Sequence, residues 1–249
     1  MKPLQSVGHP VQIGPVEIVG IEHRAALDLV FDTIAKRSFA VIGFCNAHTI
    51  NLARRDETLT QALAQMTVFN DGVGVNIARK VLYGTSFPAN LNGTDMTPAV
   101  LDQHSRPLAI FLVGSAPGVA ERAADALRRD YPRHRIVGTH HGFFTASEEA
   151  TLAETIKAAA PDLVLAGMGQ PKQEIWAVRH SDRLDCTILC VGAIIDRFAG
   201  IVPRAPAIVR RSGLEWAYRL VLEPRRLFNR YVIGNAVFLR NVYKDKAMR

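Results

Sequence analysis

The sequence predicts an α/β domain built on a mainly parallel β-sheet, and three observations support this fold class. Short apolar runs of strand length recur along the chain, and glycine or small polar residues end them. Longer segments between these runs carry apolar residues at helical spacing. The chain has 249 residues, of which 48% are hydrophobic and 21% charged, enough for one such domain with a full core. Because apolar runs that alternate with helices are typical of buried parallel strands, we expect a Rossmann-like sheet flanked by helices.

The first half of the chain begins with a short hairpin, because residues 11–21 alternate apolar and polar around Gly14-Pro15. Apolar residues at helical spacing then predict a helix over 24–35, and the apolar run at 39–45 predicts the first buried strand. The elements expected next are a helix over 50–64, a strand over 67–69, a helix after Gly74, and a helix from about Pro98 that Thr94 or Asp95 could cap.

The second half repeats this alternation of strands and helices. Its expected strands lie at residues 108–113, 136–137, 163–166 and 187–191. Its expected helices follow Gly118, span 146–160 and begin at about Glu174. Since no linker or repeat interrupts the chain before residue 200, we expect residues 1–200 to form one core domain.

Small and polar residues follow the predicted strands, at the edge of the sheet where α/β folds bind ligands. Glycine lets the backbone approach a ligand, and amide, hydroxyl and ammonium groups can contact phosphate or sugar oxygens. The candidates are Asn46, His48 and Thr49, then Asn70 and Asp71, then Asn90, Asn92, Thr94 and Asp95, then Gly114 and Ser115, and then Gly169, Gln170, Lys172 and Gln173. The last group favours a site over an ordinary turn with a solvated lysine, because three polar side chains stand together beside glycines.

Asp71 is the best catalytic candidate. It ends a predicted buried strand, and no lysine or arginine stands near it in the sequence. Partial burial raises the pKa of a carboxyl group, which suits a general base. The alternative is that Asp71 only caps the helix that follows it. His48 faces the same edge, although a lone histidine there is more often structural.

Several common site motifs are missing from the sequence. The loops after the strands lack G-x-G-x-x-G, which makes a dinucleotide oxidoreductase a poor fit. No G-x-S-x-G supports a serine hydrolase, and no D-x-D pair offers a divalent ion its usual ligands in nucleotide-sugar enzymes. We therefore expect no metal and no cofactor. The cysteines, Cys45, Cys186 and Cys190, form no C-x-x-C and are expected to be reduced core residues of a cytosolic protein.

The net positive charge of the chain comes entirely from its last fifth. Residues 201–249 hold 11 Lys and Arg against 3 Asp and Glu, whereas the first 200 residues carry a net charge of −1. We expect residues 201–249 to form a basic helical appendage that meets something anionic: a nucleic acid, a phospholipid surface or a diphosphate. Its arginines stand among Trp, Tyr and Leu, which is typical of an interfacial segment, although terminal helices packed on the core would look similar. No apolar run reaches the length of a membrane span or of a signal peptide.

Seven motifs occur together in one order. They are Asn46-Ala47-His48-Thr49, Asn70-Asp71-Gly72-Val73-Gly74, Asn92-Gly93-Thr94-Asp95, Leu112-Val113-Gly114-Ser115, Gly169-Gln170-Pro171-Lys172-Gln173-Glu174, Gly213-Leu214-Glu215-Trp216 and Glu223-Pro224-Arg225-Arg226-Leu227. The joint pattern resembles the WecG/TagA/CpsF family of bacterial glycosyltransferases over nearly the whole chain after residue 10. The resemblance implies an inverting, metal-independent transfer of a hexose from a UDP-sugar to a sugar on a membrane polyprenyl diphosphate, in the assembly of cell-wall or surface polysaccharide.

The resemblance also implies roles for individual residues. Asp71 matches the proposed base of the family, Asn46 its asparagine at the end of the first strand, and Gln173 its substrate-contacting glutamine. Two positions differ from many members: Phe44 replaces a threonine, and Asn90 replaces an arginine whose loss leaves the identity of the donor hexose open.

The sequence therefore predicts a hexosyltransferase in which Asp71 takes the proton of the acceptor hydroxyl. Gly114, Ser115, Lys172 and Gln173 are expected to bind the UDP-sugar. Arginines of the appendage, Arg211, Arg219, Arg225 and Arg226, are expected to offset the diphosphate charge. We expect a cytoplasmic protein held peripherally at the inner face of the membrane by anionic lipid, binding no nucleic acid, and the sequence leaves homo-oligomer formation open. The alternatives are a soluble nucleotide-sugar epimerase and a nucleic-acid-binding protein that uses the basic arm.

Overall fold

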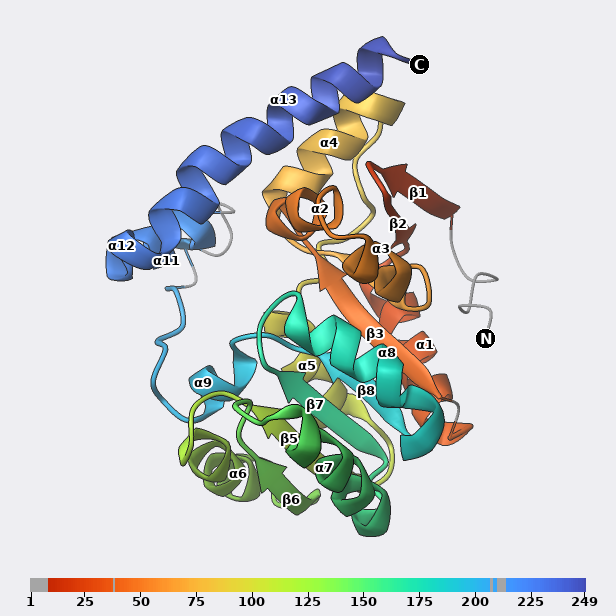
Figure 1. The fold of residues 1–249 in the computed structure, drawn as a ribbon, viewed down its shortest axis with the longest axis vertical. Coiled ribbons are helices and arrows are strands. Elements are labelled where there is room, and N and C mark those ends of the chain that lie inside the picture. Colours follow the sequence, from red (N-terminus) through yellow and green to blue (C-terminus); the bar gives the residue numbers. More distant parts are fainter. Residues whose placement is uncertain (1–8, 38, 207, 210–213) are drawn as a thin grey trace.

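A single mixed sheet of eight strands organises the computed structural model, which describes residues 9–37, 39–206, 208, 209 and 214–249 (Figure 1). The strand order is β1-β2-β4-β3-β8-β7-β5-β6; the β1–β2 hairpin is antiparallel and every other pairing is parallel. The strands are β1 His9–Ile13, β2 Val16–Gly20, β3 Ala40–Cys45, β4 Thr67–Asn70, β5 Ala109–Gly114, β6 Arg135–His140, β7 Leu163–Gly167 and β8 Thr187–Cys190. The predicted fold class is confirmed, and so is the hairpin at its start.

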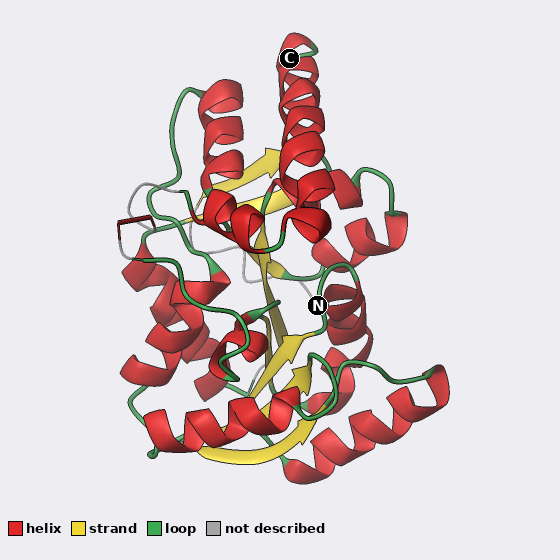
Figure 2. Ribbon diagram, turned by 90° about the vertical axis from the view of Figure 1, so that its left-hand side faces the viewer, coloured by secondary structure: helices red, strands yellow, loops and turns green. Residues whose placement is uncertain are grey.

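Helices cover both faces of this sheet (Figure 2). They are α1 His23–Ala35, α2 Ala47–Ala53, α3 Glu57–Leu63, α4 Val73–Tyr83, α5 Gly93–Gln103, α6 Val119–Asp130, α7 Ala146–Ala159, α8 Lys172–Leu184, α9 Ile194–Phe198, α11 Glu215–Leu222, α12 Pro224–Phe228, the π-helix η1 Asn229–Ile233, and α13 Gly234–Ala247.

Two helix predictions need correction. The single helix expected over 50–64 is two helices, α2 and α3, because Asp56 accepts a hydrogen bond from the Leu59 backbone N–H (3.1 Å) and so begins a new helix. The helix expected from about Pro98 begins at Gly93 instead. Its cap is Asn92, whose side chain accepts a hydrogen bond from the Asp95 N–H at 2.9 Å.

The core lies in two layers, one on each face of the sheet. Alternate residues of one strand serve the two layers: Val164 of β7 faces the layer of α8, α2 and α13, while Leu163 and Leu165 face the layer of α1, α5 and α6. This alternation follows from the two-residue period of a strand. Because both faces are covered, the central strands β3, β5, β7 and β8 are mostly apolar, which is why the sequence marks them so clearly.

The C-terminal helices differ in how they pack against the rest of the protein. Phe238 and Val242 of α13 are each only 1% exposed and belong to the core layer of α2. The Asn51 side chain donates a hydrogen bond to the Gly234 carbonyl oxygen (2.7 Å) and fixes the start of α13. By contrast, α11 and α12 pack mainly on each other and on η1, at the side of the molecule (Figure 1). In the described part of the chain, no helix combines the length and the apolarity needed to cross a bilayer.

We expect Phe238→Ala to lower the free energy of unfolding by roughly 3–5 kcal/mol, because it leaves a cavity where a buried ring joins α13 to the core. Urea unfolding measures the change. The control is Met248→Ala, since Met248 is 78% exposed and its loss should cost less than about 0.5 kcal/mol. Equal stabilities of the two variants would show that α13 does not contribute to the core.

Candidate functional site at the carboxyl edge of the sheet

Three strands end in direct backbone contact at the centre of the carboxyl edge. A Cβ atom on Gly114 of β5 would lie 2.4 Å from the Gly167 carbonyl oxygen, and one on Gly167 of β7 would lie 2.6 Å from the Gly192 carbonyl oxygen. No side chain fits at either position, so glycine is required there. The ends of β5, β7 and β8 are therefore held closer together than ordinary residues would allow.

Asp71 follows β4 at the same edge and is held by its neighbours on β3. Its backbone N–H donates to the Cys45 carbonyl oxygen (2.8 Å), and its carboxylate accepts a hydrogen bond from the Asn46 side-chain amide at 3.2 Å. Asn46 is also the cap of α2, because its side-chain oxygen accepts from the N–H groups of His48 (3.0 Å) and Thr49 (3.2 Å). One asparagine thus joins the start of a helix to the candidate base.

The loop after β7 reaches this cluster through Gln170. The Thr49 hydroxyl donates a hydrogen bond to the Gln170 side-chain oxygen at 3.0 Å. The Gln170 amide group donates to the Phe44 carbonyl oxygen at 3.3 Å. Asn46, Thr49, Asp71 and Gln170, which the sequence placed after three different strands, therefore form one hydrogen-bonded group.

Burial raises the pKa of Asp71 above the usual value of an aspartate, and this is the strongest influence on the group. The hydrogen bond from Asn46 and the positive charges of Arg230 and Arg219 lower the pKa in the opposite direction. The result is a carboxyl group with increased proton affinity that still has cations beside it. Such a balance suits a group that accepts a proton during a reaction.

Arg230 is the functional candidate that the sequence analysis did not single out. It lies on η1, and burial lowers its pKa while the charge of Asp71 raises it. The Nε atoms of Arg230 and Arg219 are buried without a hydrogen-bond partner within the described residues. A π-helix is rare and often marks a functional position, but the sequence gives no sign of where one forms.

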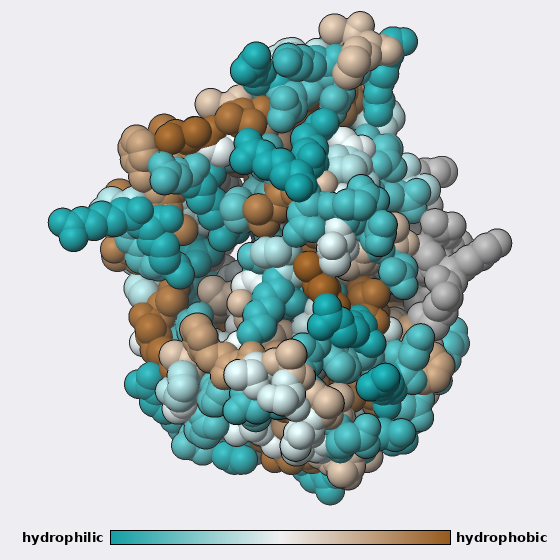
Figure 3. Space-filling view, viewed as in Figure 1, coloured by the Kyte–Doolittle hydropathy of each residue, from teal (hydrophilic) through white to brown (hydrophobic). Residues whose placement is uncertain are grey.

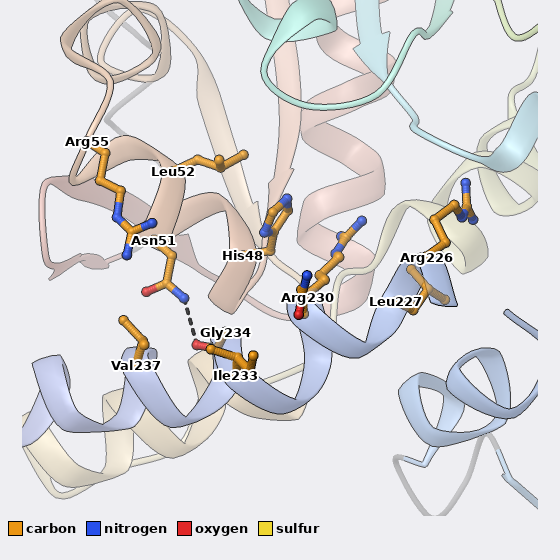
Figure 4. A pocket seen from close by; sticks show the side chains of 11 residues that line it. His48, Asn51, Leu52, Arg55, Arg226, Leu227, Arg230, Ile233, Gly234 and Val237 are labelled. Atoms are coloured by element: carbon orange, nitrogen blue, oxygen red, sulfur yellow. Dashed lines mark hydrogen bonds between the residues drawn. The ribbon is translucent and has the colours of Figure 1, made fainter. Parts of the chain in front are cut away.

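A pocket of ≈ 490 Å³ lies between α2 and the segment from α12 to α13 (Figure 4). His48 and Arg230 extend side by side in this pocket, and Arg226 lies on the α12 side. Burial and the charge of Arg230 lower the pKa of His48 to about 4, so its imidazole is neutral at physiological pH. The remaining lining residues mix polar and apolar side chains: Asn51, Leu52, Arg55, Leu227, Asn229, Ile233, Gly234 and Val237. The pocket therefore offers guanidinium groups beside apolar walls.

The polar segment after α4 borders Asp71 on its other side. The Asn90 side-chain oxygen accepts a hydrogen bond from the Gly72 N–H (2.8 Å), and the Asn70 amide donates to the Ala89 carbonyl oxygen (2.8 Å). Thr94 and Asp95 lie in the first turn of α5, where the Asn92 side chain caps the helix and Asp95 forms an ion pair with Arg204. Asn70 and Asn92 are buried and hold the backbone, whereas Asn90 is exposed beside Asp71.

A second cluster forms where β5 ends. Ser115 has φ 59°, an unusual conformation for a residue with a side chain, and its hydroxyl is buried without a partner among the described residues. The Gly142 N–H donates to the Ser115 carbonyl oxygen at 2.8 Å. The Lys172 ammonium group donates to the Gly142 carbonyl oxygen at 2.7 Å and lies 4.2 Å from the centre of the Phe144 ring. Lys172 is therefore held beside Gly114 and Ser115 rather than being freely solvated.

The remaining predicted site residues lie outside the two hydrogen-bonded clusters described above. Gln173 is only 2% exposed, and both ends of its amide group are hydrogen-bonded inside the protein, so it does not face an open site. Arg225 and Arg226 lie on the exposed side of α12, where Arg226 pairs with Glu223. Arg211 lies outside the described residues. Within those residues, no group of His, Cys, Asp or Glu side chains is arranged to hold a metal ion.

Comparison with known proteins gives a family match over most of the chain. The family described as "Glycosyl transferase WecG/TagA/CpsF family" matches residues 11–249. The chain is also 31% identical over 185 residues to an N-acetylglucosaminyldiphosphoundecaprenol N-acetyl-beta-D-mannosaminyltransferase of Staphylococcus aureus strain NCTC 8325 / PS 47, covering 73% of this chain and 72% of the relative. The enzyme of the same name from strain COL matches with the same identity and coverage.

We expect Asn46→Ala to have two effects, because Asn46 both caps α2 and donates to Asp71. Loss of the cap should lower the free energy of unfolding by about 0.5–2 kcal/mol. Loss of the amide donor should raise the pKa of Asp71 further, which carboxyl NMR titration measures. Asp56→Ala is the matched control, since it removes the cap of α3 without touching Asp71. An unchanged pKa of Asp71 in Asn46→Ala would contradict the assigned hydrogen bond.

Proposed function

Because the chain belongs to the WecG/TagA/CpsF family of glycosyl transferases, we propose that it moves a hexose from a UDP-sugar to a sugar on a membrane polyprenyl diphosphate. The staphylococcal relatives are named for transfer of N-acetylmannosamine to N-acetylglucosaminyl diphosphoundecaprenol. That donor and acceptor are therefore the first pair to test here. The products would serve cell-wall or surface-polysaccharide assembly.

The observation that carries this proposal is the environment of Asp71. Its carboxylate has a raised pKa, one amide donor from Asn46, and arginine charges nearby. In the reaction, Asp71 accepts the proton of the acceptor hydroxyl while that oxygen attacks the anomeric carbon. The bond from the anomeric carbon to the UDP oxygen breaks on the opposite side, and UDP leaves with the electron pair. A single displacement of this kind inverts the configuration of the transferred sugar.

Donor binding is proposed at the cluster that ends β5 and β7. Ser115 offers a hydroxyl that has no partner among the described residues, and Lys172 offers an ammonium group hydrogen-bonded to Gly142, which itself hydrogen-bonds to Ser115. Gly114 lets β5 end against the backbone of Gly167, which keeps the ends of β5 and β7 close together at this cluster. These groups can offset the charge that develops on UDP as it leaves. Gln173 takes no direct part, because its amide is buried and hydrogen-bonded at both ends inside the protein.

Acceptor binding is proposed at the arginines of α11, α12 and η1. Arg219 and Arg230 have buried Nε atoms without partners in the described chain, an arrangement that costs free energy unless a ligand supplies an acceptor. A diphosphate supplies several anionic oxygens, which guanidinium groups bind well. Arg226 lines the same pocket as Arg230, and Arg225 is its exposed neighbour. Together these cations would place the acceptor sugar near Asp71.

The same segment is suited to a membrane surface. Large apolar side chains are exposed on it, and hydrophilic residues surround them (Figure 3). These side chains are Val221, Leu222, Phe228, Val232 and Ile233, of which Val221 is 79% exposed. An apolar face beside arginines favours peripheral attachment to anionic lipid, on the side where the polyprenyl substrate resides.

We expect Asp71→Asn to reduce turnover by roughly 10²–10⁴-fold while leaving the melting temperature unchanged, because only proton affinity is removed. UDP release from UDP-N-acetylmannosamine, with a short-chain prenyl-diphosphate N-acetylglucosamine as acceptor, measures turnover. Asp102→Asn, on the exposed side of α5, is the control. Near-normal turnover in a folded Asp71→Asn variant would exclude Asp71 as the base.

Turnover should also be independent of divalent ions, since arginine and lysine are proposed to offset the diphosphate charge. The same assay in excess EDTA should give an unchanged rate. A rate that EDTA abolishes and Mn²⁺ or Mg²⁺ restores would show that a metal ion takes part.

Replacing Arg225 and Arg226 with glutamine should weaken binding to anionic liposomes roughly 30-fold, since each basic residue contributes ~1 kcal/mol near such a surface. Sedimentation of the full-length protein with liposomes measures binding. The matched control replaces Arg128 and Arg129, an exposed pair on α6. Truncation after Gly200 is a poor test, because it also removes the buried Phe238 and Val242. Equal binding by the two double variants would mean that α12 does not face the lipid.

A further inference from the structure

Gln173 and Glu174 form a buried polar pair directly behind the loop that follows β7. Their side chains are only 2% and 1% exposed. Burying a carboxyl group is costly unless it is paired or neutral, and no described cation forms a salt bridge with Glu174. The proposed reaction uses neither group directly. A buried pair of this kind at the edge of a site therefore calls for a physical explanation.

The Gln173 amide joins the turns that end two neighbouring strands. Its oxygen accepts hydrogen bonds from the N–H groups of Gly169 (3.1 Å) and Gly192 (3.2 Å), which follow β7 and β8. Its NH₂ group donates to Glu174 Oε1 at 2.8 Å. Both glycines have positive φ, 79° and 59°, so these turns take a conformation that few other residues adopt.

Glu174 and the two glycine N–H groups favour the same orientation of the Gln173 amide. An amide has a donor end and an acceptor end of similar size, and only the network around it selects one orientation. A carboxyl oxygen at Glu174 attracts the NH₂ end, which leaves the oxygen end for the two glycine N–H groups. If the amide were reversed, its NH₂ group would face two other donors, and both turns would lose their hydrogen bonds.

A short series of hydrogen bonds and packing contacts connects these turns to Asp71. Gln170 stands beside Gly169 and accepts the hydrogen bond of Thr49, which stands in the cap with Asn46. Asn46 in turn donates to Asp71. On the other side, the Gly192 carbonyl oxygen packs on Gly167, which packs on Gly114.

We propose that Glu174 is a positioning residue of the transferase site. By fixing the orientation of the Gln173 amide it holds the turns at Gly169 and Gly192, and through them it sets the Asn46–Asp71 pair. The effect of Glu174 on turnover rests on the proposed function. The effect of Glu174 on the two turns is independent of that function.

The protonation of Glu174 gives a second readout. Burial raises its pKa, and hydrogen bonds from Gln173, its own backbone and Gln170 lower it. The titratable groups that face it are the thiols of Cys45 on β3 and Cys190 on β8, both with pKa values raised mainly by burial. Since the folded pKa of Glu174 is raised, the neutral carboxyl stabilises the fold at low pH, and this stability is lost as the pH rises through the folded pKa. A glutamine at this position does not titrate and should remove that loss.

The test compares Glu174→Gln, Glu174→Ala and the control Glu154→Gln, on the exposed face of α7, in the full-length protein. Three quantities are measured: amide hydrogen exchange at Gly169 and Gly192, unfolding temperature against pH, and kcat and KM for the UDP-sugar. Glu174→Ala should speed exchange at both glycines and lower kcat roughly 10²-fold, because a small displacement of reacting groups has that effect. Glu174→Gln should restore slow exchange and most of kcat, and its unfolding temperature should rise relative to wild type as the pH increases. Glu154→Gln should match wild type.

The inference is wrong if exchange at Gly169 and Gly192 is unchanged in Glu174→Ala, or if Glu174→Gln is as impaired as Glu174→Ala. If Glu174→Ala fails to fold, Glu174→Gln and its pH dependence still decide the question: an unfolding temperature that parallels wild type at every pH overturns the role of the neutral carboxyl. Absence of UDP release by the wild-type protein would reject the proposed function, while the exchange measurements would still test Glu174.

Discussion

The partial burial of the Asp71 carboxyl group is the constraint on which the rest of the site depends. A carboxylate removed from water needs hydrogen-bond donors and positive charge nearby, or it remains protonated. β3 supplies one donor through Asn46, and the C-terminal segment supplies the charges of Arg219 and Arg230. The two sources come from opposite ends of the sequence. The docking of the C-terminal helices is therefore part of the electrostatics of the site, and not only a means of attachment.

The charges near Asp71 depend on how α13 is packed. The hydrogen bond from Asn51 to Gly234 and the burial of Phe238 fix the start of α13 against α2 and the core. η1 immediately precedes α13, so fixing one positions the other. Arg230 then lies near His48, whose imidazole stays neutral and adds no further positive charge. The packing of α13 on the core therefore positions η1, and η1 places the charge of Arg230 near the candidate base.

The sequence predicted most of the fold and several residues that the structure brings together at the candidate site, and the reasons are physical. Strands buried on both faces are mostly apolar, so β3, β5, β7 and β8 were predictable from their apolar runs. Parallel strands end at one edge, so Asn46, Thr49, Asp71 and Gln170 could be expected to meet. The role of Gln173 was not predicted, because the sequence does not show that its side chain turns into the protein, where it accepts hydrogen bonds from Gly169 and Gly192. Arg230 was missed because its proximity to Asp71 depends on the path of η1. The apolar residues Phe238 and Val242, four positions apart, were the available sign that α13 joins the core.

The uneven attachment of the C-terminal segment has a consequence for how such enzymes diversify. α13 is packed into the core, whereas α11 and α12 contact mainly each other and η1. Substitutions at the exposed positions of α11 and α12 therefore cost little folding free energy, while substitutions at Phe238 and Val242 of α13 cost much. Natural variation can therefore change the exposed face of α11 and α12 while the fold stays intact. Within residues 215–228 the exposed side chains are therefore the ones open to exchange, whereas Arg219 and the buried Leu227 are tied to the site and the fold.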